Sequence, residues 1–185
     1  MEQPRPAALG ERCHRVRRAP ARRAGALLRG RGALSEVGFY HLTRSSLEEA
    51  LPRLLEKAHA AGMRILLRAG SRERVDALDR HLWVYRPDSW LPHGTRADGN
   101  APLQPIWLTE QVENPNGATL LVLVDQAADD DLASFARVLD LFDGGNEDEV
   151  AAARSRWRAR REAGHRLVYW RQTERGAWEK ASEEG

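Results

Sequence analysis

"MRILLRAGSRERVDALDRHLW", residues 63–83, decides the fold class of this chain. Its first part, 63–70, is an apolar run with the length of a buried strand. Ser71 then stands where a helix N-cap is expected, and residues 71–83 continue as a helix. A buried strand that leads into a capped helix is the unit from which parallel sheets are built. The stretch therefore predicts an α/β protein.

The sequence on both sides of this unit extends the same pattern. Upstream, a strand at 37–42 precedes a helix that Ser45 or Ser46 caps, and Pro52 is expected to shift the start of that helix or to kink it. Downstream, a loop-like segment at 84–105 is followed by strands at 106–110 and 118–125, helices at 128–143 and 149–164, and a last strand at 165–173. This order predicts a Rossmann-like, three-layer α/β sandwich with a mostly parallel sheet.

Charge is distributed unevenly along the chain. Residues 1–35 hold nine arginines and two glutamates, a net charge of +7, whereas the whole chain carries +2. The remainder is therefore at −5, which argues against a surface that coats nucleic acid broadly. Residues 1–35 contain few large apolar side chains, so we expect a disordered basic leader or a start assigned upstream of the real one. The folded domain is expected at 36–172, and a flexible C-terminal tail at 173–185.

Motifs for a cofactor, a metal or a catalytic site are not found in the sequence. Neither G-x-G-x-x-G nor G-x-x-x-x-G-K-[ST] occurs, so the dinucleotide and P-loop fingerprints are missing. Cys13 is the only cysteine, and no histidines stand at metal-binding spacing. We interpret His93 as a turn histidine bonded to backbone, and the acidic run 129–131 as favourable to a helix start. The lone cysteine fits a cytoplasmic protein, and no apolar run approaches the roughly 20 residues of a membrane span.

The helix at 149–164 concentrates arginine around a tryptophan. On a helical wheel, small residues fall on one side, where they are expected to pack on the sheet: Ala152, Ser155, Ala159 and Ala163. Another side, an arc of about 100°, holds Arg154, Trp157, Arg158 and Arg161. Arginine forks bind carboxylates in pairs of hydrogen bonds, and Trp157 with Leu167 on the next strand could form an apolar wall. This side is therefore either a site for an acidic ligand with one apolar group or a solvated arginine face.

Aromatic residues also gather in "LWVYRPDSWLPHG", residues 82–94. The segment has too little regular structure to bury all its large side chains, which are Trp83, Tyr85, Trp90, Leu91 and Pro92. Clustered exposed aromatics are typical of protein interfaces. The segment is therefore either an interface or a loop folded over its own core.

Three stretches together give the chain a family resemblance. They are "FYHL" (39–42), "LDRHLWVYRPDSWLPHG" (78–94) and "ARSRWRARREAGHRL" (153–167). In this order they resemble the chi subunit of bacterial DNA polymerase III, over roughly residues 37–170. Family members often have Tyr and Lys where this chain has Trp157 and Arg158, which keeps the aromatic and basic character.

The resemblance implies a Rossmann-like fold without nucleotide chemistry, in a cytoplasmic accessory subunit of the clamp loader. It implies that the subunit links psi to the acidic C-terminal tail of single-stranded DNA-binding protein, which ends in a Pro-Phe carboxylate. Carried over by position, the tail site is Arg154, Trp157, Arg158, Arg161 and Leu167, and the psi site is Trp83, Trp90, Leu91 and Pro92. The alternative function is direct binding of single-stranded nucleic acid along the arginine-tryptophan helix face.

Overall fold

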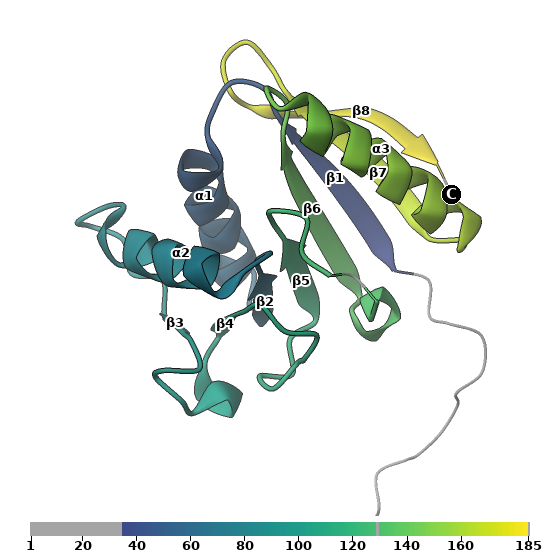
Figure 1. Ribbon diagram of the computed structural model, residues 1–185. Helices are drawn as coiled ribbons and strands as arrows, with labels where there is room; N and C mark the ends of the chain where they lie inside the picture. Colours follow the sequence, from purple (N-terminus) through teal and green to yellow (C-terminus); the bar gives the residue numbers. More distant parts are fainter. Residues whose placement is uncertain (1–34, 129, 185) are drawn as a thin grey trace, which may run out of the picture. The chain divides into compact units, whose positions relative to one another are not determined.

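The computed structural model describes residues 35–184 except residue 129, and these form one mixed sheet with three α-helices (Figure 1). The elements are β1 (Glu36–Leu42), α1 (Leu47–Ala60), β2 (Ile65–Arg68), α2 (Arg72–Val84), β3 (His93–Gly94), β4 (Ile106–Thr109), β5 (Leu120–Leu123), β6 (Arg137–Asp143), α3 (Glu147–Glu162), β7 (Arg166–Gln172) and β8 (Trp178–Glu184). The strand order is β3-β4-β2-β5-β6-β1-β7-β8, and all neighbouring pairs are parallel except β7 with β8. The predicted α/β class with a mostly parallel sheet is confirmed.

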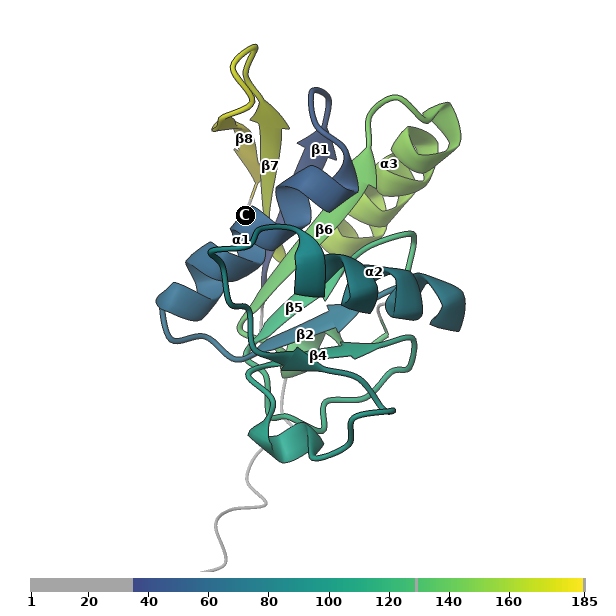
Figure 2. The same cartoon turned by 90° about the vertical axis from the view of Figure 1, so that its left-hand side faces the viewer.

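Helices cover both faces of the sheet, which makes three layers. Helices α1 and α2 lie on one face and α3 on the other (Figures 1 and 2). Each face buries its own apolar cluster, with Leu55 and Leu78 on the α1–α2 side and Phe39 and Ala153 on the α3 side. Because side chains alternate along a strand, neighbouring residues of β1 contribute to different clusters.

The first two helices begin where the sequence predicts. Ser46 caps α1 through a capping box with Glu49, and the Ser71 hydroxyl accepts a hydrogen bond from the backbone N–H of Arg74. Pro52 lies inside α1 and does not move its start. A proline removes the N–H that would bond the carbonyl four residues earlier, here that of Glu48. The ring Nε2 of His81 lies 2.8 Å from this carbonyl oxygen and replaces the lost donor.

The helix predicted at 128–143 is wrong, because residues 137–143 form the central strand β6. A short 3₁₀ turn at Leu132–Ser134 precedes it. Strand β6 lies between β5 and β1, and Val138, Leu139, Leu141 and Phe142 are all buried. A strand covered on both faces is a nearly continuous apolar run without alternation. Such a run also satisfies helical spacing, so its periodicity does not separate the two structures.

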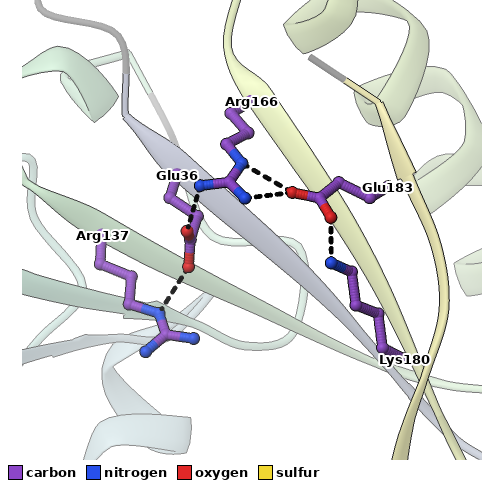
Figure 3. A network of polar contacts seen from close by, with 5 residues as sticks. All are labelled: Glu36, Arg137, Arg166, Lys180 and Glu183. Atoms are coloured by element: carbon purple, nitrogen blue, oxygen red, sulfur yellow. Dashed lines mark hydrogen bonds and ion pairs between the residues drawn. The ribbon is translucent and has the colours of Figure 1, made fainter.

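The flexible tail predicted at 173–185 is also wrong for residues 178–184, which form β8 on the edge of the sheet. The Trp178 ring meets the Tyr40 ring edge-on, 4.9 Å between centroids. Five charged side chains form a network across the neighbouring strands β6, β1, β7 and β8 (Figure 3): Arg137, Glu36, Arg166, Glu183 and Lys180. Backbone pairing, the aromatic contact and this network hold a strand whose composition is mostly polar.

The folded domain that was expected to begin at residue 36 also includes Ser35. Ser35 is buried, and its hydroxyl donates to the carbonyl oxygens of Leu132 (2.9 Å) and Phe135 (2.8 Å). The rest of the expected leader, residues 1–34, lies outside the described residues.

Candidate ligand-binding site on helix α3

Helix α3 packs on the sheet through a different side from the one expected. Ala152, Ser155, Ala159 and Ala163 are exposed or half-buried, whereas Ala153 and Arg160 are buried. The reason is Asp140 of β6, whose side chain is buried beneath the helix. Arg156 donates two hydrogen bonds to its carboxylate, at 2.8 and 2.9 Å, and Arg160 donates one at 2.6 Å. A buried carboxylate requires such partners, so it draws two of the helix arginines toward the sheet.

A cavity of about 550 Å³ lies beside α3, which lines part of it, and we call this cavity the α3 pocket. Its residues come from β1, β6, α3, β7 and β8: Phe39, His41, Phe142, Val150, Ala153, Arg154, Trp157, Arg158, Tyr169, Ser182 and Glu184. The Trp157 ring lies 5.0 Å from that of Phe39 and edge-on to that of Tyr169 at 6.3 Å. These rings give the pocket an aromatic interior that suits an apolar side chain.

Positive charge in the α3 pocket lies at its rim. Arg154 and Arg158 are exposed, and within residues 35–184 as described their guanidinium groups form no ion pair. Neighbouring Arg161 is 3.4 Å from the carboxylate of Glu184 on β8. Two guanidinium groups are thus available to an anion, while Glu184 opposes its approach.

The two ionisable groups inside the pocket bond to each other. The Nδ1 atom of His41 is within hydrogen-bonding distance of the Tyr169 hydroxyl. Burial lowers the pKa of His41, and Arg154 lowers it further, although Asp143 acts in the opposite direction. Burial also raises the pKa of Tyr169. Both groups are therefore neutral at pH 7, so the interior carries no charge and the rim arginines set the sign of the ligand.

The structure brings together most, but not all, of the residues predicted for this site. Arg154, Trp157 and Arg158 line the pocket, and Arg161 contacts its edge through Glu184. Leu167 is 0% exposed and belongs to the core beneath the helix, so it forms no wall. Its place is taken by Tyr169, two residues later on the same face of β7.

Sequence reasoning missed the pocket residues outside α3. Phe39 and His41 share one face of β1, and alternation along the predicted strand 37–42 was a signal that could have grouped them. Ser182 and Glu184 lie on β8, in the segment that was expected to be flexible, so no signal pointed to them.

Residues 82–94, which we call the aromatic loop, begin in the last turn of α2, where Trp83 lies, and combine two exposed tryptophans with two covered residues. Trp83 and Trp90 are 63% and 80% exposed, whereas Leu91 is 3% exposed in the core and Pro92 is half-buried. The Trp83 ring packs against the ring of His93, 4.9 Å between centroids. Nδ1 of His93 lies 2.7 Å from the carbonyl oxygen of Leu91, which confirms a histidine bonded to backbone. The loop therefore presents two indoles to solvent from a fixed base.

Most of the chain matches one known protein family. The family described as DNA polymerase III chi subunit, HolC, matches residues 34–168. The chain belongs to the family of DNA polymerase III chi subunits. It is 30% identical over 141 residues to the DNA polymerase III subunit chi of Pseudomonas aeruginosa, covering 72% of this chain and 94% of that protein. It is 28% identical over 91 residues to the probable subunit chi of Rickettsia prowazekii, covering 49% of this chain and 55% of that protein.

The chi match contains the aromatic loop and all of α3, but it ends before β8 begins. Arg154, Trp157 and Arg158 thus lie inside the matched region. Ser182 and Glu184 lie beyond it, so β8 adds to the α3 pocket a polar edge outside the residues that the family match covers.

Across residues 35–128 and 130–184, no group of three His, Cys, Asp or Glu side chains could hold a metal ion. Asp131 of the acidic run directly precedes the 3₁₀ turn, and its carboxylate receives two hydrogen bonds from the fully buried Arg68, at 2.7 and 3.0 Å. No helix in this part of the chain is long and apolar enough to cross a membrane.

Proposed function

We propose that this chi-family chain is a non-catalytic accessory subunit of a DNA polymerase III holoenzyme. It links the clamp loader, through psi, to the acidic C-terminal tail of single-stranded DNA-binding protein. The observation that carries the proposal is the α3 pocket, in which an aromatic interior meets two exposed arginines at the rim. A chain end with an apolar side chain behind a free carboxylate has the matching chemistry.

The pocket geometry suggests how such a tail binds. The terminal apolar side chain enters among Phe39, Phe142 and Trp157. The carboxylate is then at the rim, where Arg154 and Arg158 can each donate two hydrogen bonds. Because the interior is uncharged, it favours a ring over a second carboxylate. A site of this size should bind with a dissociation constant of about 1 μM, near −8 kcal/mol, and the affinity should fall with salt.

The exposed part of the aromatic loop is the proposed psi site. Trp83 and Trp90 have the exposure and residue type of interface anchors. Leu91 is buried and Pro92 half-buried, so in this proposal they hold the loop rather than contact psi.

Calorimetric titration with an acidic peptide that ends in Phe-COO⁻ tests the tail site. Arg158→Ala should weaken binding about tenfold or more, because a hydrogen bond to a charged group contributes roughly 1.5–3 kcal/mol. Arg175→Ala, which removes an exposed guanidinium in the β7–β8 turn, is the matched control. Glu184→Gln should tighten binding up to about fivefold, by the usual size of exposed charge effects, and Glu174→Gln is its control.

Altered ligands complete the test. Amidation of the terminal carboxylate and replacement of the last Phe by Ala should each remove most of the affinity. If both peptides bind like the parent, the pocket does not read a chain end. If a short oligonucleotide binds at the same arginines and displaces the peptide, the alternative function on α3 replaces the proposed one.

A further inference from the structure

A second cavity lies on the opposite face of the sheet, beside α1. It has a volume of about 510 Å³, and we call it the α1 groove. It lies between α1 and strands β5, β6, β1, β7 and β8. Its lining residues are Tyr40, Arg44, Ser45, Ala50, Arg53, Leu54, Lys57, Ala58, Ala61, Met63, Leu120, Arg137, Leu139, Trp170, Gln172, Gly176 and Trp178. No residue is shared with the α3 pocket, so the groove is a separate feature.

Three aromatic rings form one side of the α1 groove. Trp170 stacks on Tyr40 with centroids 5.8 Å apart, and Trp178 meets Tyr40 edge-on. Tyr40 is buried, whereas both tryptophans are half-buried and present part of their rings to the groove. Gly38 allows this packing, because a Cβ atom there would lie 2.8 Å from the Tyr40 ring.

The charged residues that line the groove are all basic. They are Arg44, Arg53, Lys57 and Arg137, with no carboxylate among the lining residues. Within the described part of the chain, the side chains of Arg44, Arg53 and Lys57 form no ion pair or hydrogen bond. Arg53 and Lys57 are one helical turn apart, where like charges destabilise a helix slightly. On a body that is otherwise acidic, this row is positioned to meet an anion.

The two end members of this row of cations, Arg44 and Arg137, are held in place by neighbouring residues. The Gln172 amide oxygen accepts hydrogen bonds from the backbone N–H groups of Thr43, Arg44 and Ser45, at 3.0, 2.8 and 3.2 Å, which fixes the loop that carries Arg44. At the other end, Arg137 belongs to the network in Figure 3, which has three cations and two carboxylates and so keeps a positive balance.

We propose that the α1 groove binds a short segment of single-stranded nucleic acid. Bases would stack on the exposed parts of Trp170 and Trp178, and phosphates would contact Arg44, Arg53 and Lys57. The cations are spaced along the groove, with Arg53 and Lys57 about 6 Å apart along the helix axis, as a chain of repeated charges requires. The inference goes beyond the adaptor role and uses none of its residues.

Fluorescence anisotropy of a labelled oligothymidylate with the full chain, measured at several salt concentrations, tests the proposal. The double variant Arg53→Ala/Lys57→Ala should bind at least fivefold more weakly than the parent. Its plot of log affinity against log salt should be shallower by about 1.4, the value for two lost phosphate contacts on a single strand. The control Arg154→Ala/Arg158→Ala removes the same charge from the other face and should change little. The basic residues 1–35 are identical in both variants, so they do not affect the comparison.

Trp178→Ala should also weaken the oligonucleotide, whereas Trp90→Ala, on the aromatic loop, should not. Titration with the acidic Phe-terminated peptide shows that each groove variant still folds and keeps its α3 pocket. The proposal is overturned if the groove variants bind the oligonucleotide like the parent, or if the α3 control loses more affinity. It is also overturned if the groove variants lose the acidic peptide rather than the oligonucleotide, which would make the groove a peptide site.

Discussion

Replacement of Asp140 tests what holds α3 on the sheet. Asp140 is 2% exposed and receives hydrogen bonds from Arg156 and Arg160, and Arg160 is itself 3% exposed. Asp140→Asn keeps the size of the side chain but removes the negative charge that both guanidinium groups face. Arg156, with 18% of its side chain exposed, can turn toward water, whereas Arg160, with 4%, cannot. The lost negative charge therefore matters most at the buried Arg160.

Removing one partner of a buried ion pair destabilises a protein by about 3–5 kcal/mol. For a folded part of this size, that corresponds to a decrease in melting temperature of about 10 °C. Urea denaturation followed by circular dichroism measures the free energy of unfolding. Asp140→Leu combined with Arg160→Met should recover much of the loss, because apolar residues of similar volume often replace a buried ion pair without cost. If Asp140→Asn lowers the free energy of unfolding by less than about 1 kcal/mol, the pair is no stronger than an exposed one and the reasoning is refuted.

Two further predictions concern the loop and pH. Trp90→Ala should change the free energy of unfolding by less than about 0.5 kcal/mol and yet remove co-purification with psi. Leu91→Ala should lower the free energy of unfolding by about 2–5 kcal/mol. If both variants lose the same stability, the loop is part of the hydrophobic core and not an interface. Since the pKa of His41 is lowered from its ordinary value of 6.5, the unfolded chain binds more protons below that pH. Stability should therefore fall as pH decreases from about 6.5, and His41→Gln should reduce this dependence in urea titrations at pH 7 and 5.5.

The parts of the fold that could be predicted are those in which one local signal dominates. Ser46 and Ser71 mark two helix starts, and the pattern of strand followed by helix gave the parallel sheet. Strand β6 could not be recognised, because burial on both faces removes the alternation that distinguishes a strand. Strand β8 could not be recognised either, because its polar side chains give no pattern and its stability comes from β7 and from distant charges.

The candidate site was predictable where it depends on one helix. Arg154, Trp157 and Arg158 are neighbours by helical geometry alone, and the structure places all three in the pocket. Which arginines turn inward could not be read from the sequence, because that depends on Asp140, sixteen residues before Arg156 and on another element. Leu167 was misplaced for a related reason. Leu167 does lie on the predicted face of β7, but the packing of α3 on the sheet buries it completely.

Strand β8 contributes to both sites because its pairing with β7 is irregular. Tyr169 of β7 lines the α3 pocket and Trp170 lines the α1 groove, as alternation along a strand requires. On β8, however, Trp178 serves the groove while Ser182 and Glu184 serve the pocket, although their numbers have the same parity. Tyr169 pairs with Ser182 and Trp170 with Lys180, so Ala181 is an extra residue at this step. A bulge of one residue reverses the faces that follow it. Without it, Ser182 and Glu184 would lie on the face of Trp178, and Ala181 and Glu183 would take their places opposite Tyr169 and Leu167. The bulge therefore determines that Glu184, and not Glu183, is the carboxylate that opposes an acidic ligand at the α3 pocket.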